Sequence, residues 1–493
     1  MVRVAGGSKG CHACRKRKKS CDGQRPSCGQ CLSRNEQCPG YVRNYKFVNT
    51  SSARVPSPNP GKASGARKGL CRLDAGKSLS SQTLVLQRSA VADYCGSYFL
   101  DNVIRSGLDI FGRYLDWMAL VPSLDLREPS LRSVFLALGA ARVGRTYNDD
   151  RMNRLSSQAY SLALNQLRTR IQTGAGGLED EVLASMMFLA TYETMEGSSS
   201  RGLGWASHTQ AALSLVQSQG FSAEWSTVKH GLFEGLRTFA IVHCIGTRKP
   251  TFLASPEWTS LPWKGYAKSP QQYLLDLLTE VPGFLQQMDT VVSVSDPLEK
   301  YEKLAKICDN YSDFAIRLDT WYETYKHHNP GPLYWEQPSD LYKTQRTTQL
   351  YTPFAKCIVF PNPETGRIQL FYWTTHLLLF SNLGMVYQEC LMGKELGLKP
   401  TLPPFPCNIT RMHGIAVDIA KSMEYFLRPE TVSLASCSLA FPISIALGYF
   451  EYYNLPEVQW FRVVFDHIKG FGVDVGSFID AVADETDLAL VAC

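Results

Sequence analysis

The chain has 493 residues and 44% of them are hydrophobic, so it is too long for one ordinary domain and too apolar to be mostly disordered. Its formal net charge of +6 hides an uneven distribution. The first 80 residues hold 17 Lys and Arg against 3 Asp and Glu, a net +14, which leaves −8 on the other 413. A basic N-terminal segment followed by an acidic remainder indicates a nucleic-acid partner at one end of the chain only.

Six cysteines stand close together near the start of the chain. Their spacing, C-x2-C-x6-C-x6-C-x2-C-x6-C, consists of two copies of one half-site with three thiols each. Zinc prefers four soft ligands in a tetrahedron, so three thiols per half fall one short. Two ions are still satisfied if one sulfur from each half bridges both metals. The pattern therefore predicts two Zn²⁺ ions held by Cys11, Cys14, Cys21, Cys28, Cys31 and Cys38.

A disulfide framework, a thiol metal store and a RING or LIM module fit these cysteines less well. Disulfide frameworks are typical of small secreted domains, and the sequence shows no secretory signal peptide. Metal storage by thiols alone would not require the basic run between Cys14 and Cys21. RING and LIM modules use longer separations and usually histidine ligands. His12 lies between two cysteines but has no partner at ligand spacing, so we expect it to be an exposed residue that does not bind metal.

Five of the six residues between Cys14 and Cys21 are basic. A stretch this short and charged cannot build a core, so its side chains must project once metal ties both ends. Such a surface suits the phosphate backbone of DNA, and one or two basic side chains can also reach guanine N7 and O6 in the major groove. A nuclear-import signal is the plainer interpretation and is compatible with DNA binding. The predicted DNA-binding residues are Arg15, Lys16, Arg17, Lys18 and Lys19.

The cysteine spacing, the Cys-Arg-x-Arg-Lys-Lys-x-Cys run and the Arg25-Pro26 loop resemble the fungal Zn2Cys6 (zinc binuclear cluster) transcription factors. The resemblance implies that Cys11 and Cys28 are the bridging ligands. It also implies that Lys18 reads a CGG triplet in the major groove, flanked by Arg17 and Lys19. The expected partners are double-stranded DNA with CGG-type half-sites and the transcription machinery or coactivators, and the expected location is the nucleus.

Residues 51–81 are rich in Ser, Gly, Pro and basic residues. We therefore expect a flexible basic linker over 49–84, between a DNA-binding domain over 1–48 and a large domain over 85–493. Many proteins of this family dimerise through a coiled coil just after the cluster. No apolar heptads occur between Tyr41 and about Leu86. This favours binding as a monomer, or as a homodimer formed through the large domain.

The large domain has the pattern of an all-α domain with little strand alternation. Leu155, Ala159, Leu162, Gln166 and Ile171 recur near helical spacing and predict one helix. Further helices are expected at Leu178–Glu196, Trp205–Gln219, Gln271–Val292 with a break at Pro282, Leu298–Lys326, Ile368–Leu391, Arg411–Phe426, Ser433–Tyr453 and Val458–Ile468. The overall expectation is a small Zn2Cys6 binuclear cluster module followed by a large all-α domain.

Two features of this domain admit two interpretations. The uncharged stretches Ile368–Gln388 and Thr431–Phe450 are long enough for membrane spans, but their polar residues and Pro442 favour buried helices, so no membrane partner is expected. His208 lies on an apolar helix face, where a lone histidine is more often a core residue than a catalytic or metal-binding one. Glu193 on the preceding helix is its expected hydrogen-bonding partner.

Several short motifs of the large domain, in their order, resemble the fungal-specific regulatory domain that accompanies such clusters. They cover about residues 85–475 and comprise the Ala137–Arg145 run, Tyr192-Glu193 with Trp205 and His208, Lys249-Pro250-Thr251-Phe252 with Trp258, and Phe441-Pro442. The resemblance implies an all-α regulatory domain without catalytic activity. The tail Phe478–Cys493 mixes acidic and apolar residues, which suits either coactivator recruitment or a final amphipathic helix.

The sequence contains no Gly-rich phosphate loop, GxSxG elbow, HExxH motif or second metal cluster, so we do not expect an enzyme. The leading interpretation is a zinc-dependent, sequence-specific transcription factor of the RNA polymerase II type that recognises CGG-like triplets. Regulation of a secondary-metabolite or nutrient-use gene cluster is a family-level expectation. The alternative is a zinc-stabilised protein-interaction protein without specific DNA binding, which predicts no salt-sensitive affinity for DNA.

Overall fold

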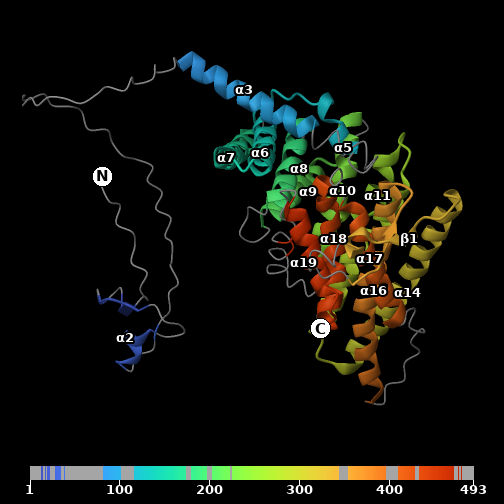
Figure 1. Cartoon of the computed structure of the whole chain (residues 1–493). Helices are drawn as coiled ribbons and strands as arrows, with labels where there is room; N and C mark the ends of the chain where they lie inside the picture. Colours follow the sequence, from blue (N-terminus) through green and yellow to red (C-terminus); the bar gives the residue numbers. More distant parts are fainter. Residues whose placement is uncertain are drawn as a thin grey trace, which may run out of the picture. The chain divides into compact units, whose positions relative to one another are not determined.

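The computed structural model describes residues 13–14, 17, 19–22, 28–34, 38, 81–101, 116–173, 179–196, 203–221, 225–343, 353–395, 409–427, 432–470, 476 and 479. The chain divides into two compact units, Met1–Lys77 and Ser78–Cys493 (Figure 1). Cys11, Arg15, Lys16 and Lys18 lie outside the described residues, as do residues 49–80 of the predicted linker and the predicted tail apart from Ile479.

The large unit is helical, as the sequence predicts. Its first half contains α3 (Ser81–Phe99), α5 (Asp116–Ala119), η3 (Val121–Ser123), α6 (Pro129–Thr146), α7 (Asp150–Thr173), α8 (Asp180–Glu196), α9 (Leu203–Gln219) and α10 (Thr227–Gly246). Its second half contains η4 (Phe252–Ala254), α11 (Pro256–Ser260), η5 (Leu261–Trp263), α12 (Pro270–Leu278), α13 (Val281–Val292), α14 (Pro297–His328), α16 (Pro363–Glu395), α17 (Ile409–Phe426), α18 (Val432–Tyr452) and α19 (Val458–Gly470).

Local sequence signals explain where several of these helices begin. The carboxylate of Asp296 accepts the backbone N–H of Glu299 at 2.9 Å, and Pro297 occupies the first helical turn, so α14 has both a side-chain cap and a preset φ. Basic residues gather in its last turn, where they complement the helix dipole. The predicted break near Pro282 is also present, because α12 ends at Leu278 and Pro282 stands in the first turn of α13.

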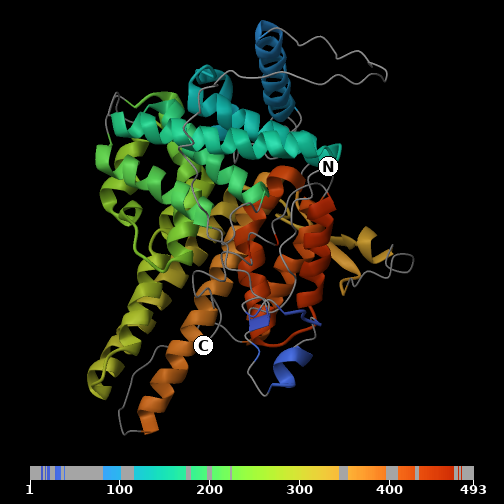
Figure 2. The ribbon, with the colours of Figure 1, turned by 90° about the vertical axis from the view of Figure 1, so that its left-hand side faces the viewer.

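Helix α8 lies at the centre of the first half. Fourteen of its 17 residues are buried, which explains why it is apolar on most sides. The ring of Phe188 lies 4.8 Å from the rings of both Trp117 and Phe135, so α5 and α6 pack against α8 through aromatic contacts. In the second half, the long helices α14 and α16 pack along each other (Figure 2).

The buried face of α7 differs from the predicted one. Leu162 and Ile171 are 49% and 45% exposed, whereas Ser156, Ala159, Ala163 and Leu167 are buried. Small side chains let α7 approach α6 closely, and the Ser156 hydroxyl donates to the carbonyl of Ala137 at 2.8 Å. Ala159 is buried as predicted, and the rest of the buried face consists of Leu167 and two small residues that apolar periodicity does not indicate.

A short two-stranded antiparallel sheet, which the sequence did not predict, lies between α14 and α16 in the chain. Strands β1 (Trp335–Pro338) and β2 (Lys356–Val359) pair with Trp335 opposite Val359. Each strand has only four residues, and β1 is mostly exposed, so neither carries a readable alternation.

The two long uncharged stretches belong to α16 and α18, where most of the described side chains are buried. Within the ranges that the structure describes, no helix combines the length and hydrophobicity needed to cross a membrane.

Candidate metal centre

Three thiols meet in the interior of the small unit. The Sγ atoms of Cys14, Cys28 and Cys31 all lie within 4.8 Å of one another, and none of the three side chains is exposed. The Cys14 and Cys28 sulfurs are 3.8 Å apart. This separation is far too long for a disulfide, which needs about 2 Å. Two sulfurs bound to one zinc ion at ~2.3 Å with a tetrahedral angle lie roughly 3.8 Å apart. The thiols therefore fit a shared zinc ion.

A second group shares one of these thiols. The Sγ atoms of Cys21 and Cys28 and a carboxylate oxygen of Asp22 also lie within 4.8 Å of one another. Cys28 thus stands between two groups of ligand atoms, which is where a bridging sulfur is needed. Cys38 is half-buried and packs against the same cluster of cysteines. Five of the six predicted ligands therefore gather in one place, and the sixth, Cys11, lies outside the described residues.

Tight turns bring the thiols together. Cys28 immediately precedes α2 (Gly29–Leu32), and its carbonyl accepts the N–H groups of Cys31 at 3.0 Å and Leu32 at 3.1 Å. The C-x2-C segment is therefore a helical turn that places both sulfurs on one side. In the first half-site, the N–H of Arg17 bonds the carbonyl of Ala13 and that of Lys19 bonds the carbonyl of Cys14, both at 3.0 Å. The sequence pseudo-repeat thus has a structural counterpart.

Two polar contacts connect the half-sites, and the sequence did not indicate either of them. The backbone N–H of Gly29 donates to the Asp22 carboxylate, at 2.9 Å to Oδ2 and 3.2 Å to Oδ1. The Nη2 of Arg17 donates to the Sγ of Cys31 at 3.6 Å. The only sequence signal for them is position, because Asp22 follows the third cysteine and Gly29 follows the fourth.

Two of the five predicted DNA-binding residues are described. Lys19 is exposed, whereas Arg17 is half-buried and directs its guanidinium toward Cys31. Their environments differ, so the two basic side chains are not equivalent candidates for contacts with DNA.

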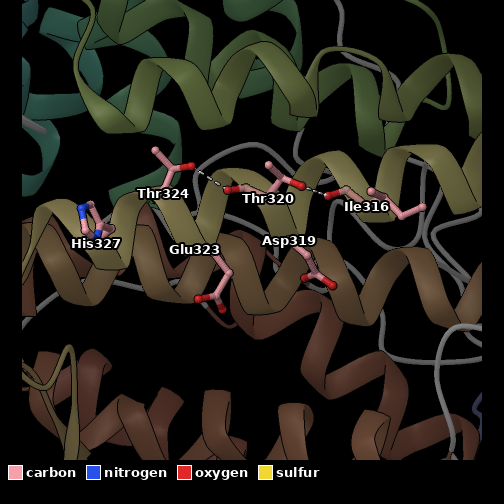
Figure 3. Close-up of a pocket in the computed structure, with 6 residues that line it drawn as sticks. All are labelled: Ile316, Asp319, Thr320, Glu323, Thr324 and His327. Atoms are coloured by element: carbon pink, nitrogen blue, oxygen red, sulfur yellow. Dashed lines mark hydrogen bonds between the residues drawn. The ribbon is translucent and has the colours of Figure 1, made fainter.

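The large unit has a groove of about 610 Å³ along α14 (Figure 3). The Thr320 and Thr324 hydroxyls donate to carbonyls of their own helix, at 2.7 and 2.9 Å. Among the described residues the groove is lined by Ile316, Asp319, Thr320, Glu323, Thr324 and His327.

Two side chains of α16 contact the carboxylate of Asp319 in this groove. It accepts the Tyr372 hydroxyl at 2.7 Å, and its Oδ1 lies 2.9 Å from Nε2 of the buried His376. Burial opposes ionisation of Asp319, but the contacts with His376 and Tyr372 prevail and lower its pKa. Burial lowers the pKa of His376, which favours the neutral imidazole. These contacts tie α14 to α16, so we assign them a structural role.

His208 is half-buried in the bundle, and its hydrogen-bonding partner differs from the predicted one. Its Nε2 lies 3.1 Å from the hydroxyl of Tyr160, and that hydroxyl donates to Glu193. Glu193 therefore reaches His208 through Tyr160. Burial lowers the pKa of His208, although the charge of Glu193 opposes the shift. The imidazole is therefore held at the contact between α7 and α9.

Comparison with known proteins gives two family matches. The model described as the fungal Zn(2)-Cys(6) binuclear cluster domain matches residues 9–46, and the one described as the fungal specific transcription factor domain matches residues 93–444. An uncharacterized protein of Emericella nidulans is 28% identical over 151 residues, which are 30% of this chain and 31% of that protein. The chain thus matches about a third of the length of that relative. No solved structure gives a significant match.

Proposed function

This chain belongs to the fungal specific transcription factors that carry a Zn(2)-Cys(6) binuclear cluster domain, and from this membership we propose that it recognises CGG-like triplets in double-stranded DNA through a two-zinc cluster. Membership itself makes the chain a zinc-binding, DNA-binding regulator of transcription, and neither domain is an enzyme domain. The triplet, the number of ions and the roles of individual residues form the proposal.

The proposed zinc ligands are Cys11, Cys14, Cys21, Cys28, Cys31 and Cys38, with Cys11 and Cys28 as bridges. The observation that carries this assignment is the position of Cys28, whose sulfur lies 3.8 Å from Cys14 and belongs to both groups of ligand atoms. Zinc bound there supplies folding free energy, because the cysteines are the buried cluster of the small unit's described residues.

The proposed reader of the triplet is Lys18, with Arg15, Lys16, Arg17 and Lys19 at flanking bases or phosphates. Exposed Lys19 suits a phosphate contact. The contact of Arg17 with Cys31 supports a role for Arg17 in orienting the basic run. One or two basic side chains at base edges supply specificity, while the rest supply salt-dependent affinity.

The proposed organisation is a DNA-binding domain over 1–48, a linker over 49–84 and a regulatory domain over 85–493, acting in the nucleus. Helix α3 begins at Ser81, so it overlaps the end of the proposed linker. We propose monomeric binding or a homodimer formed through the helical domain, since the sequence lacks heptads after the cluster. The targets would be secondary-metabolite or nutrient-use genes, with coactivators as further partners.

Selection of bound sequences from a random DNA library tests the proposal, with zinc-loaded full-length protein at low and at physiological salt. Enrichment of one CGG-like triplet supports monomeric recognition, and two triplets at fixed spacing support a dimer. Protein stripped of zinc by a chelator is the control and should enrich nothing. No enrichment by zinc-loaded protein at either salt concentration would favour the alternative, a protein-interaction role.

A further inference from the structure

Helix α2 begins without the usual side-chain cap. The first N–H groups of a helix lack acceptors within it, and a side-chain oxygen of the N-cap residue normally supplies one. The N-cap of α2 is Cys28, whose backbone is extended and whose side chain makes no capping hydrogen bond. Its sulfur lies instead among the cysteine thiols, 3.8 Å from that of Cys14. The acceptor must therefore come from another residue.

Asp22 supplies that acceptor from the other half-site. Both of its oxygens lie within hydrogen-bonding distance of the Gly29 N–H, at 2.9 and 3.2 Å. Aspartate is among the best capping side chains. Here it acts from seven residues upstream, directly after Cys21. The contact therefore joins the end of the first half-site to the start of the second.

The glycine that receives this contact is closely fitted to it. A Cβ built on Gly29 would lie 2.6 Å from Oδ2 of Asp22, closer than real Cβ contacts. A larger residue at position 29 must shift the carboxylate, which is the far end of a flexible side chain. A substitution at position 29 should therefore loosen the contact, whereas removal of the Asp22 carboxylate abolishes it.

A carboxylate is also an acceptable zinc ligand, and Asp22 lies near the sulfurs of Cys21 and Cys28. Capping accounts better for its position because both oxygens face the Gly29 amide. In the proposed cluster, two of the six thiolates bind both ions, so each zinc ion already has four sulfur ligands. A carboxylate is therefore not needed as a further ligand.

We propose that Asp22 is a positioning residue that couples the two halves of the zinc cluster, by capping α2 in place of Cys28. The proposal rests on the proposed two-zinc site. When zinc fixes Cys21, Asp22 is fixed beside it and orders the turn that presents Cys28 and Cys31. Binding of one ion thereby favours binding of the other, and the one-zinc form is scarce.

Zinc titration of the full-length protein, read by native mass spectrometry, tests this coupling because it separates the forms with zero, one and two ions. The variants are Asp22→Ala, Asp22→Asn and Gly29→Ala. The matched control is Ser33→Ala, which removes the exposed contact of Ser33 with the Gln30 carbonyl at the other end of α2. Thermal unfolding of the large unit confirms that each variant is otherwise folded.

The expected result for Asp22→Ala is about 2- to 30-fold weaker binding of the second ion, the effect of losing one helix cap, with a rise in the one-zinc form. Gly29→Ala should change the binding of the second ion in the same direction but by less, because its backbone N–H remains. Asp22→Asn keeps an oxygen acceptor without the charge, so it should retain most of the coupling, and Ser33→Ala should match the unchanged protein.

Two results would overturn the proposal. A one-zinc fraction in Asp22→Ala equal to that of the unchanged protein would show that the contact couples nothing. An Asp22→Asn variant as defective as Asp22→Ala would assign Asp22 to the metal as a ligand or charge. Failure of the proposed function is distinguishable, because the unchanged protein would then not reach two zinc ions.

Discussion

The Nε2 atom of His208 lies 3.1 Å from the hydroxyl oxygen of Tyr160. The same hydroxyl donates to the buried carboxylate of Glu193, and the Tyr160 ring stacks on Tyr192 with centroids 4.6 Å apart. Tyr160 comes from α7, Glu193 and Tyr192 from α8, and His208 from α9. One hydroxyl therefore connects three helices, so its removal should lower the stability of the large unit.

We expect Tyr160→Phe to lower the free energy of unfolding by about 1–3 kcal/mol, because a buried carboxylate loses a donor while the ring packing is kept. Chemical unfolding followed by circular dichroism measures this change. Tyr147→Phe is the control, since Tyr147 is 65% exposed and its hydroxyl should contribute little. Equal stability of the Tyr160 and Tyr147 variants would show that the hydroxyl does not hold the helices together.

Asp418 should make the large unit more stable as the pH falls. Burial raises its pKa from the ordinary 3.8 to about 6, with Lys421 opposing and Glu336 reinforcing the shift. Between these values the folded state binds more protons than the unfolded state, so this residue adds stability as the pH falls from 7 to 4. Above pH 6 the buried charge costs stability.

Asp418→Asn removes that charge and should stabilise the protein at pH 7.5 by about 1–2 kcal/mol, after allowance for solvent screening. The gain should shrink toward pH 4, where the native aspartate is protonated. Urea unfolding at pH 7.5 and 4.5 measures both values. A gain of the same size at both pH values would contradict the raised pKa.

Asp276 neutralises two cations in the interior. Its Oδ1 accepts the Arg237 guanidinium at 2.6 Å, and its Oδ2 accepts the Lys268 ammonium at 2.5 Å. The Arg237 side chain is fully buried. Asp276→Ala leaves two cations close together without their shared anion, so we expect a loss of about 3–5 kcal/mol.

Thermal unfolding of Asp276→Ala checks this, with Asp340→Ala as the matched control. Asp340 pairs with Lys343 at the surface, where the two side chains are 81% and 61% exposed. Such a pair contributes at most about 1 kcal/mol. A similar small loss for both variants would mean that the interior pair is solvated in solution.

Cysteine spacing was the most informative part of the sequence, because metal ligation fixes which residues must meet. Many helix positions were also predictable, since runs such as α8 are apolar on most sides and bounded by glycine or acidic residues, but α6 and α10 were not predicted. The buried face of α7 was not fully predictable, because the small residues Ser156 and Ala163 are buried there and neither adds to an apolar pattern of large side chains. Neither the Asp22–Gly29 contact nor the link from Tyr160 to His208 has a sequence period, since both depend on how separate segments pack.

Lys18 and Lys19 should affect DNA binding differently. If Lys18 reads the triplet, Lys18→Ala relaxes the choice of base there by about 1–3 kcal/mol. If the exposed Lys19 contacts a phosphate, Lys19→Ala should weaken binding to all DNA sequences alike. It should also reduce the slope of affinity against salt concentration by about one. Competition binding with matched and mismatched DNA at several salt concentrations measures both effects. Uniform weakening by Lys18→Ala would make Lys18 a phosphate contact as well.

The bridging role of Cys28 can be separated from the role of a terminal ligand such as Cys31. Cys28 belongs to both groups of ligand atoms, whereas Cys31 belongs to one. Cys28→Ala removes a ligand from both ions and should leave fewer than one zinc per chain, whereas Cys31→Ala should leave about one. Zinc content after dialysis, measured by atomic emission, checks the difference. If Cys28→Ala kept about two ions, its sulfur would not be a bridge, and equal loss in both variants would mean that the ions bind only together.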